Sequence, residues 1–528
     1  MPDQRRTKHI YFNGRPFGKS SSLPDIRLDE TKVIGSLYLF KPLLEKLGLK
    51  EAVDTVVPMQ RDIAGGITHG QVLEQLIINR LDAPCPLVDI EYWAHERCVE
   101  AVYGIPSEKL NDDRVGRALD AMSEYTSDIE DIIVLKALSH FNIDPKLILW
   151  DTTSFYFEGD YDASELITLG YSRDQKKDKK QVVVELNITA EGGIPLAHRI
   201  LPGNASDRTE AVQNLDKIKS KLKNRDMVVI GDRAMFTKEN MVTLLDKKIS
   251  FLGPSCAMER EYILSVPDNL FTPLRYTTSG GKGGYSGVEI DHHSFTHKGK
   301  EYWIRTLVVK SEDLFRQQQK TLVRQLGVIE ARLQEITEQL NNRKFKDKTY
   351  AAGQIEKAFS RHKELRHLFN INLEGSDGQL SLTWGYDRVA IDEENRLLGK
   401  YMLVTNLNQK DYDADQLLEL YKSRHQIESR FRSLKNDLKI RPIFLQSEER
   451  IKSLILVNIL ALLVYSLLEW ICQRNKLATS GRDALDIFRL PTIVTLTFQG
   501  QTIRQIGNVS SQAEQVMAVM KLGPPDPV

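Results

Sequence analysis

The chain has 528 residues, with 72 Lys and Arg against 72 Asp and Glu, and it is 41% hydrophobic and 27% charged. This composition is typical of a soluble globular protein and excludes a disordered or fibrous chain. The length exceeds what one hydrophobic core usually holds, so we expect about two to four structural units. Because the net charge is zero, a positive surface for a polyanion has to be local.

The cysteines and the apolar segments indicate a cytoplasmic protein. No C-x-x-C pair is formed by the four cysteines, so we expect neither a zinc site nor a disulfide framework: Cys85, Cys98, Cys256 and Cys472. The basic N-terminal residues precede no apolar run, so we expect no signal peptide. The apolar run 454–468 is shorter than the ~20 residues of a membrane span. We interpret it as a buried core helix; a transmembrane helix is the alternative.

Residues 1–145 are predicted to form a mainly helical N-terminal domain. Apolar residues recur at helical spacing in "GQVLEQLIINRL" and in "DDRVGRALDAMSEYTSDIEDIIVLKAL". Asn111 precedes the second run and suits a helix start. A helix-turn-helix and a plain helical bundle both fit this pattern.

From residue 146 the chain alternates between strand and helix patterns, which predicts a mixed α/β sheet. Strands are expected in "KLILWDTTSFYF", "QVVVELNIT", "GIPLAHRIL" and "DMVVIGDRA", with helices following the third and fourth of them. We divide the remaining chain into four parts: a first core segment 146–254, an insertion 255–400, a second core segment 401–480 and a polar tail 481–528.

The insertion is predicted to contain β structure and a helical hairpin. A long charged helix carries apolar residues at alternating steps of four and three, the pattern of a coiled-coil seam: Leu322, Leu326, Ile329, Leu333, Ile336 and Leu340. A returning helix is expected to supply Ile355, Phe359, Leu365 and Leu368. The strand pattern resumes in "GKYMLVTN" at 399–406, so the core is expected to continue there.

The stretch "YKSRHQIESRFRSLKNDLKI" at 421–440 is predicted to be a helix with a polar stripe beside its buried face. At 100° per residue, a sector of about 60° holds four residues: Tyr421, Arg424, Glu428 and Lys435. The neighbouring stripe is apolar and is expected to face a core: Ile427, Phe431, Leu434 and Leu438. One wall of a cleft fits this pattern, and so does a surface helix with an Arg424–Glu428 ion pair.

Carboxylates and basic residues together indicate phosphate chemistry. Asp151 and Asp232 each follow an apolar strand pattern, where ligands gather in α/β sheets. With Glu428 they would form an oxygen site for Mg²⁺ or Mn²⁺, and two such ions can promote phosphoryl transfer. Residues 421–441 carry seven Lys or Arg against two acids, a net charge of +5. Each aspartate taken alone also fits a turn or helix cap.

The gaps between Tyr421, Arg424, Glu428 and Lys435 match the Tyr-Arg-Glu-Lys signature of bacterial insertion-sequence DDE transposases, the IS-four-like superfamily. Further stretches resemble this family: "WDTTSFYFEG", "GYSRDQKKDKKQVVVELNIT", "GIPLAHRILPGNASDRT" and "VVIGDRAMF". The resemblance extends over about 65–480. It implies a ribonuclease-H-like core in which Asp151, Asp232 and Glu428 bind metal. The other signature residues, Tyr421, Arg424 and Lys435, are then expected to contact the phosphates of the element's end.

The same resemblance implies an activity and its partners. Water activated by metal nicks DNA at the element's end, the freed 3′-hydroxyl attacks target DNA, and a homodimer or larger assembly pairs two ends. The N-terminal domain is then the candidate for recognising the terminal repeats. Further residues are predicted to touch DNA: Arg173, Lys176, Lys177, Arg432 and Lys439. For the basic run 173–181, a solvated hairpin tip is the alternative.

The helical part of the insertion departs from the mostly β insertion of this family. A route through a hairpin intermediate is therefore left open, as is stacking of Trp303 or Trp384 on a displaced base; each Trp also fits an ordinary core position. Two rival functions remain: a ribonuclease-H-like nuclease that does not join ends, and a non-catalytic DNA-binding protein. The presence of all three carboxylates favours an enzyme, because a binding protein needs none of them.

Overall fold

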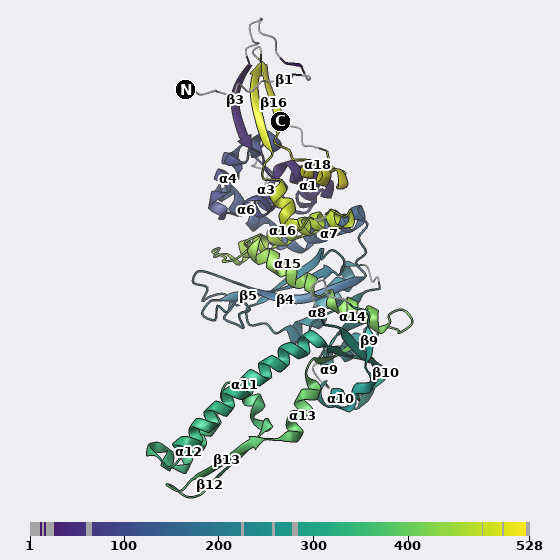
Figure 1. Ribbon diagram of the computed structural model, residues 1–528. Helices are drawn as coiled ribbons and strands as arrows, with labels where there is room; N and C mark the ends of the chain where they lie inside the picture. Colours follow the sequence, from purple (N-terminus) through teal and green to yellow (C-terminus); the bar gives the residue numbers. More distant parts are fainter. Residues whose placement is uncertain are drawn as a thin grey trace, which may run out of the picture. The chain divides into compact units, whose positions relative to one another are not determined.

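The computed structural model describes residues 11–12, 15–16, 26–59, 66–222, 226–255, 259–276, 283–477, 479–498 and 501–523 (Figure 1). The chain forms two compact units. The first contains Met1–Ile143, Glu158–Asp160 and Arg432–Val528, and the second contains Asp144–Phe157 and Tyr161–Phe431. The mixed α/β class predicted from the sequence is confirmed.

The first unit is built mainly from helices. Its N-terminal part contains α1 (Leu37–Leu47), α2 (Leu49–Val56), α3 (His69–Asp82), α4 (Ile90–Glu96), α5 (Val99–Tyr103), α6 (Asp112–Met122) and α7 (Thr126–Phe141). Thr68 and Gln71 form a capping box at the start of α3, and the Asn111 side chain accepts the Arg114 N–H at the start of α6. These caps satisfy backbone donors that would otherwise lack partners, so they set where the helices begin.

Helix α16 (Glu448–Arg474) forms the centre of the first unit, where it contacts α3 and α6. By length and composition it could cross a membrane, since its mean hydropathy reaches 2.2. However, 94% of its most apolar stretch is buried inside the protein. The burial supports the interpretation of 454–468 as a core helix, because apolar side chains on every face of α16 are covered by protein.

Residues 481–498 and 501–523 are folded, which corrects the prediction of a polar tail for this part of 481–528. They form α17 (Gly481–Ile487), β15 (Thr492–Phe498), β16 (Gln501–Gly507) and α18 (Ser511–Val519). Strand β15 lies between β16 and β3 (Ile26–Val33), and it pairs antiparallel with both. Because β3 lies more than 450 residues earlier in the chain, local sequence pattern contains no sign of this pairing. A short hairpin of β1 (Tyr11–Phe12) and β2 (Arg15–Pro16) precedes it.

The second unit is organised around a nine-stranded mixed sheet with the order β6-β5-β4-β7-β8-β14-β11-β10-β9. Its strands are β4 (Leu147–Tyr156), β5 (Gln181–Thr189), β6 (Pro195–Pro202), β7 (Val228–Ile230), β8 (Ser250–Pro254), β9 (Thr272–Leu274), β10 (Tyr285–His297), β11 (Lys300–Ser311) and β14 (Lys400–Thr405). Among the described strands of this sheet, only β4-β7 and β7-β8 pair in parallel. Every residue of β5 is buried, so both faces of the sheet are covered there.

Five helices of the second unit connect or follow these strands: α8 (Asp207–Lys221), α9 (Lys238–Asp246), α10 (Glu259–Ser265), α14 (Ala414–Lys422) and α15 (His425–Asn436). The last of them, α15, runs past the boundary between the units at Phe431. The stretch predicted as one helix over 421–440 is therefore two helices with a turn at residues 423–424. Only the second of them carries Glu428 and Lys435.

The insertion predicted over 255–400 is divided between the sheet and a separate cluster. Strands β9, β10 and β11 extend the large sheet, and the remainder forms α11 (Glu312–Gln339), α12 (Lys348–Ala358), β12 (Phe369–Glu374), β13 (Ser381–Tyr386) and α13 (Arg388–Leu397). The predicted seam on α11 is buried at Leu322, Ile329, Leu333 and Ile336. It packs against the whole cluster, including β12 and β13, because α12 has only 11 residues and cannot cover a helix of 28.

Candidate active site

Asp151 lies within β4 and not at its end, which corrects the sequence-based placement. The strand continues to Tyr156, and Asp151 pairs with Leu186 of β5. The pairing of β4 with β7, however, ends at Leu149 and Ile230. Relative to this parallel pair, Asp151 therefore stands two residues past the last paired position, where a side chain can reach the edge of the sheet.

Asp232 occupies the equivalent position beyond β7, two residues after Ile230. Its carboxylate accepts backbone N–H groups from Ala234 and Met235, at 2.9 and 3.3 Å. Both hydrogen bonds hold the side chain in a turn, as the local interpretation expected. Since parallel strands end at one edge of a sheet, the register brings Asp151 and Asp232 to the same edge.

The environment of Asp151 disfavours its charged form. Burial raises the pKa of Asp151 to about 6, Arg424 lowers this pKa, and the negative charge of Asp232 raises it. The Thr152 N–H also donates to the Asp151 carboxylate, at 2.8 Å. Two neighbouring carboxylates of this kind repel each other, and a cation between them relieves the repulsion. This donor chemistry fits Mg²⁺ or Mn²⁺, which prefer carboxylate oxygens.

Arg424 supplies a cation next to Asp151 in the folded chain. Its Nη2 lies 3.5 Å from Asp151 Oδ2, and both side chains are largely buried. Its Nε atom is buried and has no hydrogen-bond partner among the described residues. The break between α14 and α15 places Arg424 in the turn, so the guanidinium approaches the sheet in a way that one continuous helix does not predict.

Glu428 lies in the first turn of α15, and its side chain is exposed. Across the described residues, no group of three His, Cys, Asp or Glu side chains is close enough to hold a metal ion. The structure thus brings Asp151 and Asp232 together without gathering Glu428 into the same cluster. The sequence left open a surface ion pair between Arg424 and Glu428. In the structure, the ion-pair contact of Arg424 is with Asp151.

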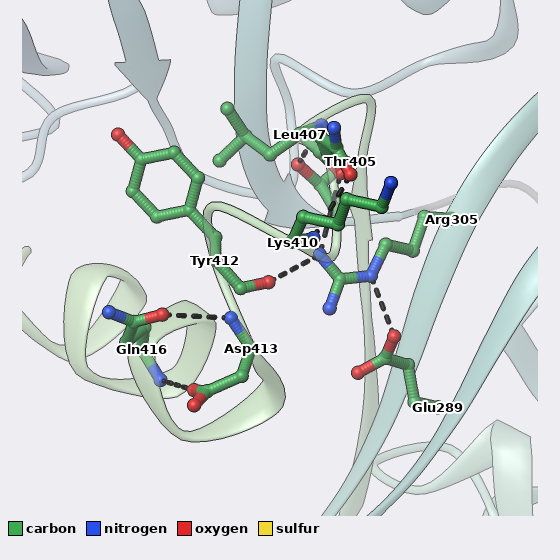
Figure 2. A network of polar contacts seen from close by, with 9 residues as sticks. Glu289, Arg305, Thr405, Leu407, Lys410, Tyr412, Asp413 and Gln416 are labelled. Atoms are coloured by element: carbon green, nitrogen blue, oxygen red, sulfur yellow. Dashed lines mark hydrogen bonds and ion pairs between the residues drawn. The ribbon is translucent and has the colours of Figure 1, made fainter.

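A polar network fixes the segment that leads into α14 (Figure 2). The Arg305 side chain on β11 contacts Glu289 of β10 at 2.8 Å and donates to the Tyr412 carbonyl at 2.7 Å. At the helix start, Asp413 and Gln416 form a capping box. Buried Arg305 therefore anchors the 407–412 loop to the sheet. The loop in turn determines the position of α14 and of Arg424, which follows it.

A cavity of about 970 Å³ adjoins the loop after Asp232. Cationic side chains predominate among the charged groups of its lining: Arg233, Lys238, Arg260 and Lys400, with Glu261 as the acid. Tyr262, His293 and Tyr401 add aromatic surface to the same lining. Such a combination suits a ligand with phosphate and planar groups.

Residues 142–464 match the family described as "Transposase DDE domain". The chain belongs to this DDE transposase family. Residues 29–134 match a domain of unknown function (DUF4277). No curated protein matches the transposase in sequence.

Seven chains of solved structures match the transposase, and two of them illustrate how weak the resemblance is. One is titled "Cryo-EM structure of piggyBac transposase synaptic complex with hairpin DNA (SNHP)", with 8% identity, a TM-score of 0.38 and coverage of 87% of this chain and 80% of that chain. The other is "Mos1 transposase paired-end complex with left transposon end", with 12% identity, a TM-score of 0.15 and coverage of 38% of this chain and 63% of that chain. Both TM-scores are too low to establish a shared fold.

Tyr421 of the transposase belongs to an aromatic cluster at the end of α14. Its ring lies 5.9 Å from the Tyr401 ring, and the Lys422 ammonium lies over the rings of Tyr285 and Tyr401 at 4.6 and 5.5 Å. Burial raises the pKa of Tyr401 far above its ordinary value, and the neighbouring tyrosines add to this increase. These contacts hold Tyr421 by packing on the sheet.

The other predicted DNA contacts differ in their surroundings. Arg173 donates to Thr152 Oγ1 beside Asp151, and its charge contributes to lowering the pKa of Asp151. Lys176 and Lys177 are exposed in the loop before β5. The remaining three lie in the first unit: Lys435 is half-buried on α15, and Arg432 and Lys439 are exposed.

Two arginines with structural roles were missed by sequence reasoning. Arg430 was counted with the basic patch, but it is 2% exposed and donates to the carbonyls of Gly192 and Gly193 at 2.7 and 3.1 Å. It thereby fastens α15 to the turn between β5 and β6. Arg305 carries the network described above. A charged residue gives no local sign that it will be buried, although "GG" at 192–193 indicates a tight turn.

The two tryptophans considered for base stacking also differ. Trp384 lies on β13, donates to Thr337 Oγ1 at 3.2 Å and packs on the core of the α11 cluster. It is therefore an ordinary structural aromatic residue. Trp303 lies on β11, and its side chain is 56% exposed.

Proposed function

We propose that this transposase cleaves DNA at the ends of an insertion sequence and joins the freed 3′ ends to target DNA. The observation that carries the proposal is the Asp151–Asp232 pair at one edge of the mixed sheet, with Arg424 beside it. The order β6-β5-β4-β7-β8, with three antiparallel strands followed by two parallel ones, supports a ribonuclease-H-like core. Membership of the DDE family supports the same reaction class.

Asp151 and Asp232 would hold the divalent cation, and Glu428 would complete the ligand set once α15 brings its exposed side chain to the pair. Bound there, Mg²⁺ or Mn²⁺, as one ion or two, supplies a Lewis acid that activates water and stabilises the leaving 3′ oxygen. Asp232 is already oriented by two backbone N–H groups, and Asp151 by one. These hydrogen bonds restrict the rotation of both carboxylates, as is typical of carboxylates that ligate a metal.

Basic side chains, beginning with Arg424 beside Asp151, would hold the phosphate backbone of double-stranded DNA. The buried Nε of Arg424 has no hydrogen-bond partner within the part of the chain that the structure describes, so the guanidinium would become available to a phosphate once Asp151 turns to a cation. Tyr421, Lys435 and Arg173 would add contacts, followed by the exposed cations Lys176, Lys177, Arg432 and Lys439. The cationic cavity beside Asp232 would accept further parts of the nucleic acid.

The helical first unit would recognise the terminal repeats, and a homodimer or larger assembly would pair two ends. One similar structure is titled a synaptic complex with hairpin DNA, and the other a paired-end complex with the left transposon end. We also propose a cytoplasmic location, with which the free thiols of Cys85, Cys98 and Cys472 agree.

A strand-transfer assay tests the proposal. The full chain is incubated with Mg²⁺, a target plasmid and labelled duplexes that carry the inverted repeats flanking its coding region. We expect joined products, and at least an ~100-fold loss of cleavage in Asp151→Asn, Asp232→Asn and Glu428→Gln. Glu419→Gln, an exposed residue on α14, serves as the matched control and should retain activity.

Each other outcome of this assay indicates a different function for the protein. Ends that are cut but never joined indicate a nuclease, and intact DNA that is bound indicates a non-catalytic binding protein. If Glu428→Gln cleaved at the wild-type rate while both aspartate variants were inactive, Glu428 would not be a metal ligand.

A further inference from the structure

The far end of the α11 cluster carries a concentration of positive charge that the active site does not use. We call residues 312–397 the arm and residues 343–348, "RKFKDK", the basic tip. Four cations and one acid give the basic tip a net charge of +3, whereas α11 itself has five acids against four bases. Figure 1 shows α11 leading from the large sheet to α12, β12 and β13. The charge is thus concentrated where the arm ends.

The basic tip is held in one conformation by bonds to the turn between β12 and β13. Asn341 and Leu380 exchange two hydrogen bonds, at 2.9 and 2.7 Å. The Gly378 N–H donates to the Lys346 carbonyl at 2.8 Å, and Lys348 Nζ donates to the Gly375 carbonyl at 3.1 Å. Beneath these bonds, the arm has its own hydrophobic core. The cations therefore project from an ordered surface.

Three cations of the basic tip have no ion-pair partner among the residues that the structure describes: Arg343, Lys344 and Lys346. On α11, by contrast, Arg316 pairs with Glu312 and Asp313, and Arg332 pairs with Glu335. The one acid of the tip, Asp347, is engaged as the N-cap of α12, where it accepts the Tyr350 N–H. These three cations are therefore available to bind a negatively charged partner.

The chemistry of the basic tip favours a phosphate backbone over a protein partner. Its exposed residues are flexible cations, and Phe345 is half-buried against Tyr350, with ring centroids 5.2 Å apart. A protein interface usually has a buried apolar or aromatic anchor at its centre. Repeated phosphates, in contrast, are contacted by exposed Lys and Arg without an apolar anchor.

We propose that the basic tip binds the backbone of duplex DNA at a distance from the cleavage point. With 28 residues, α11 spans about 42 Å, which equals the length of about 12 base pairs of DNA. The arm thus adds a second contact to DNA that is held at the active site. This inference rests on the proposed function, because it takes the DNA substrate as given.

Binding of the full chain to element-end duplexes tests the inference. In Lys344→Gln/Lys346→Gln, the backbone bonds of the tip stay intact because only side-chain charge is removed. We expect this variant to bind a long duplex about 5- to 10-fold more weakly and to lower the slope of log K against log salt by about 2. A duplex of about 12 base pairs, too short to reach the tip, should be bound as by the wild type.

Two further variants control for charge and for folding. Lys320→Gln/Arg324→Gln removes the same charge from exposed positions on α11 and should leave the salt slope unchanged. Lys344→Arg/Lys346→Arg keeps the charge and should retain wild-type affinity. Lengthening the duplex on the element side or on the flanking side identifies which DNA the tip contacts, because only that extension becomes sensitive to the tip variant.

The inference is wrong if the tip variant binds every duplex as tightly as the wild type, or if the α11 control loses affinity to the same extent. Either outcome counts against the inference only when the wild-type chain itself binds and cleaves the element ends. A wild-type chain that does neither contradicts the proposed function itself, so the two failures are distinguishable.

Discussion

The Arg424 guanidinium lies 3.5 Å from the Asp151 carboxylate, Nη2 to Oδ2, although 272 residues separate them in the chain. Both side chains are less than one-fifth exposed. The charge of Arg424 lowers the pKa of Asp151, opposing the larger effect of burial. This pair connects the turn before α15 with β4, an interior strand of the sheet, so it preorganises two residues that the reaction is proposed to use.

A double-mutant cycle measures this relationship. Arg424→Gln leaves a buried carboxylate without its cation, so we expect a loss of about 1–3 kcal/mol of stability at neutral pH. Asp151→Asn in the same chain should recover much of that loss, with a coupling energy of about 1–2 kcal/mol. Thermal unfolding without divalent cations provides the measurement. The more exposed pair Arg260–Glu394 is the control and should show a coupling below about 1 kcal/mol.

The network around Arg305 predicts a local defect in α14 and the segment that leads into it. Arg305→Met leaves Glu289 unpaired and removes the donor to the Tyr412 carbonyl, so we expect destabilisation of about 3–5 kcal/mol. Hydrogen exchange should increase over 406–422. Arg316→Met removes an exposed ion pair instead, and its expected cost is below about 1 kcal/mol. Unchanged exchange over 406–422 in Arg305→Met would show that the network does not hold α14.

The core of the arm predicts unequal effects for two leucines on α11. Leu333 is fully buried, so Leu333→Ala should cost about 2–5 kcal/mol, while Leu326→Ala should cost less because Leu326 is only partly buried. Faster hydrogen exchange is expected over 312–397, with strands β4 to β7 protected as in the wild type. Equal losses of protection in the arm and in the sheet would contradict a separate core.

Buried Glu74 on α3 predicts how stability depends on pH. Burial raises the pKa of Glu74 from 4.5 to about 8, with further increases from Glu51 and Glu45. The folded chain therefore holds a proton that the unfolded chain has released, and the stability contributed by that proton is lost as pH rises from 4.5 through 8. At pH 7 this cost reaches up to about 3 kcal/mol.

Glu74→Gln removes that dependence, so the variant should be more stable than the wild type at pH 8 and similar to it near pH 4.5. Thermal midpoints of both chains across this range supply the measurement. Glu108→Gln, at an exposed position, should parallel the wild type throughout. A difference between Glu74→Gln and the wild type that stays constant with pH would contradict the raised pKa.

Much of the local structure could be read from the sequence because it depends on neighbouring residues. The cap at Asn111, the apolar periodicity of α11 and α16, and the strand patterns around Asp151 and Asp232 all act over a few residues. The spacing of the signature residues likewise indicated the family to which the chain belongs. Local pattern did not reveal the turn at residues 423–424, where helix propensity favoured one continuous helix.

Only the tertiary structure decided which distant residues meet. The parallel register of β4 with β7 aligned Asp151 with Asp232, and the break before α15 directed Arg424 to Asp151. The pairing of β15 with β3 incorporates part of the predicted tail, residues 492–498, into a sheet. Burial of Arg305 and Arg430 became visible only when the carbonyls that accept their hydrogen bonds were in place. The sequence by itself determined the residue types, the local elements and the family, whereas contacts across hundreds of residues depend on packing and strand register, which no local pattern encodes.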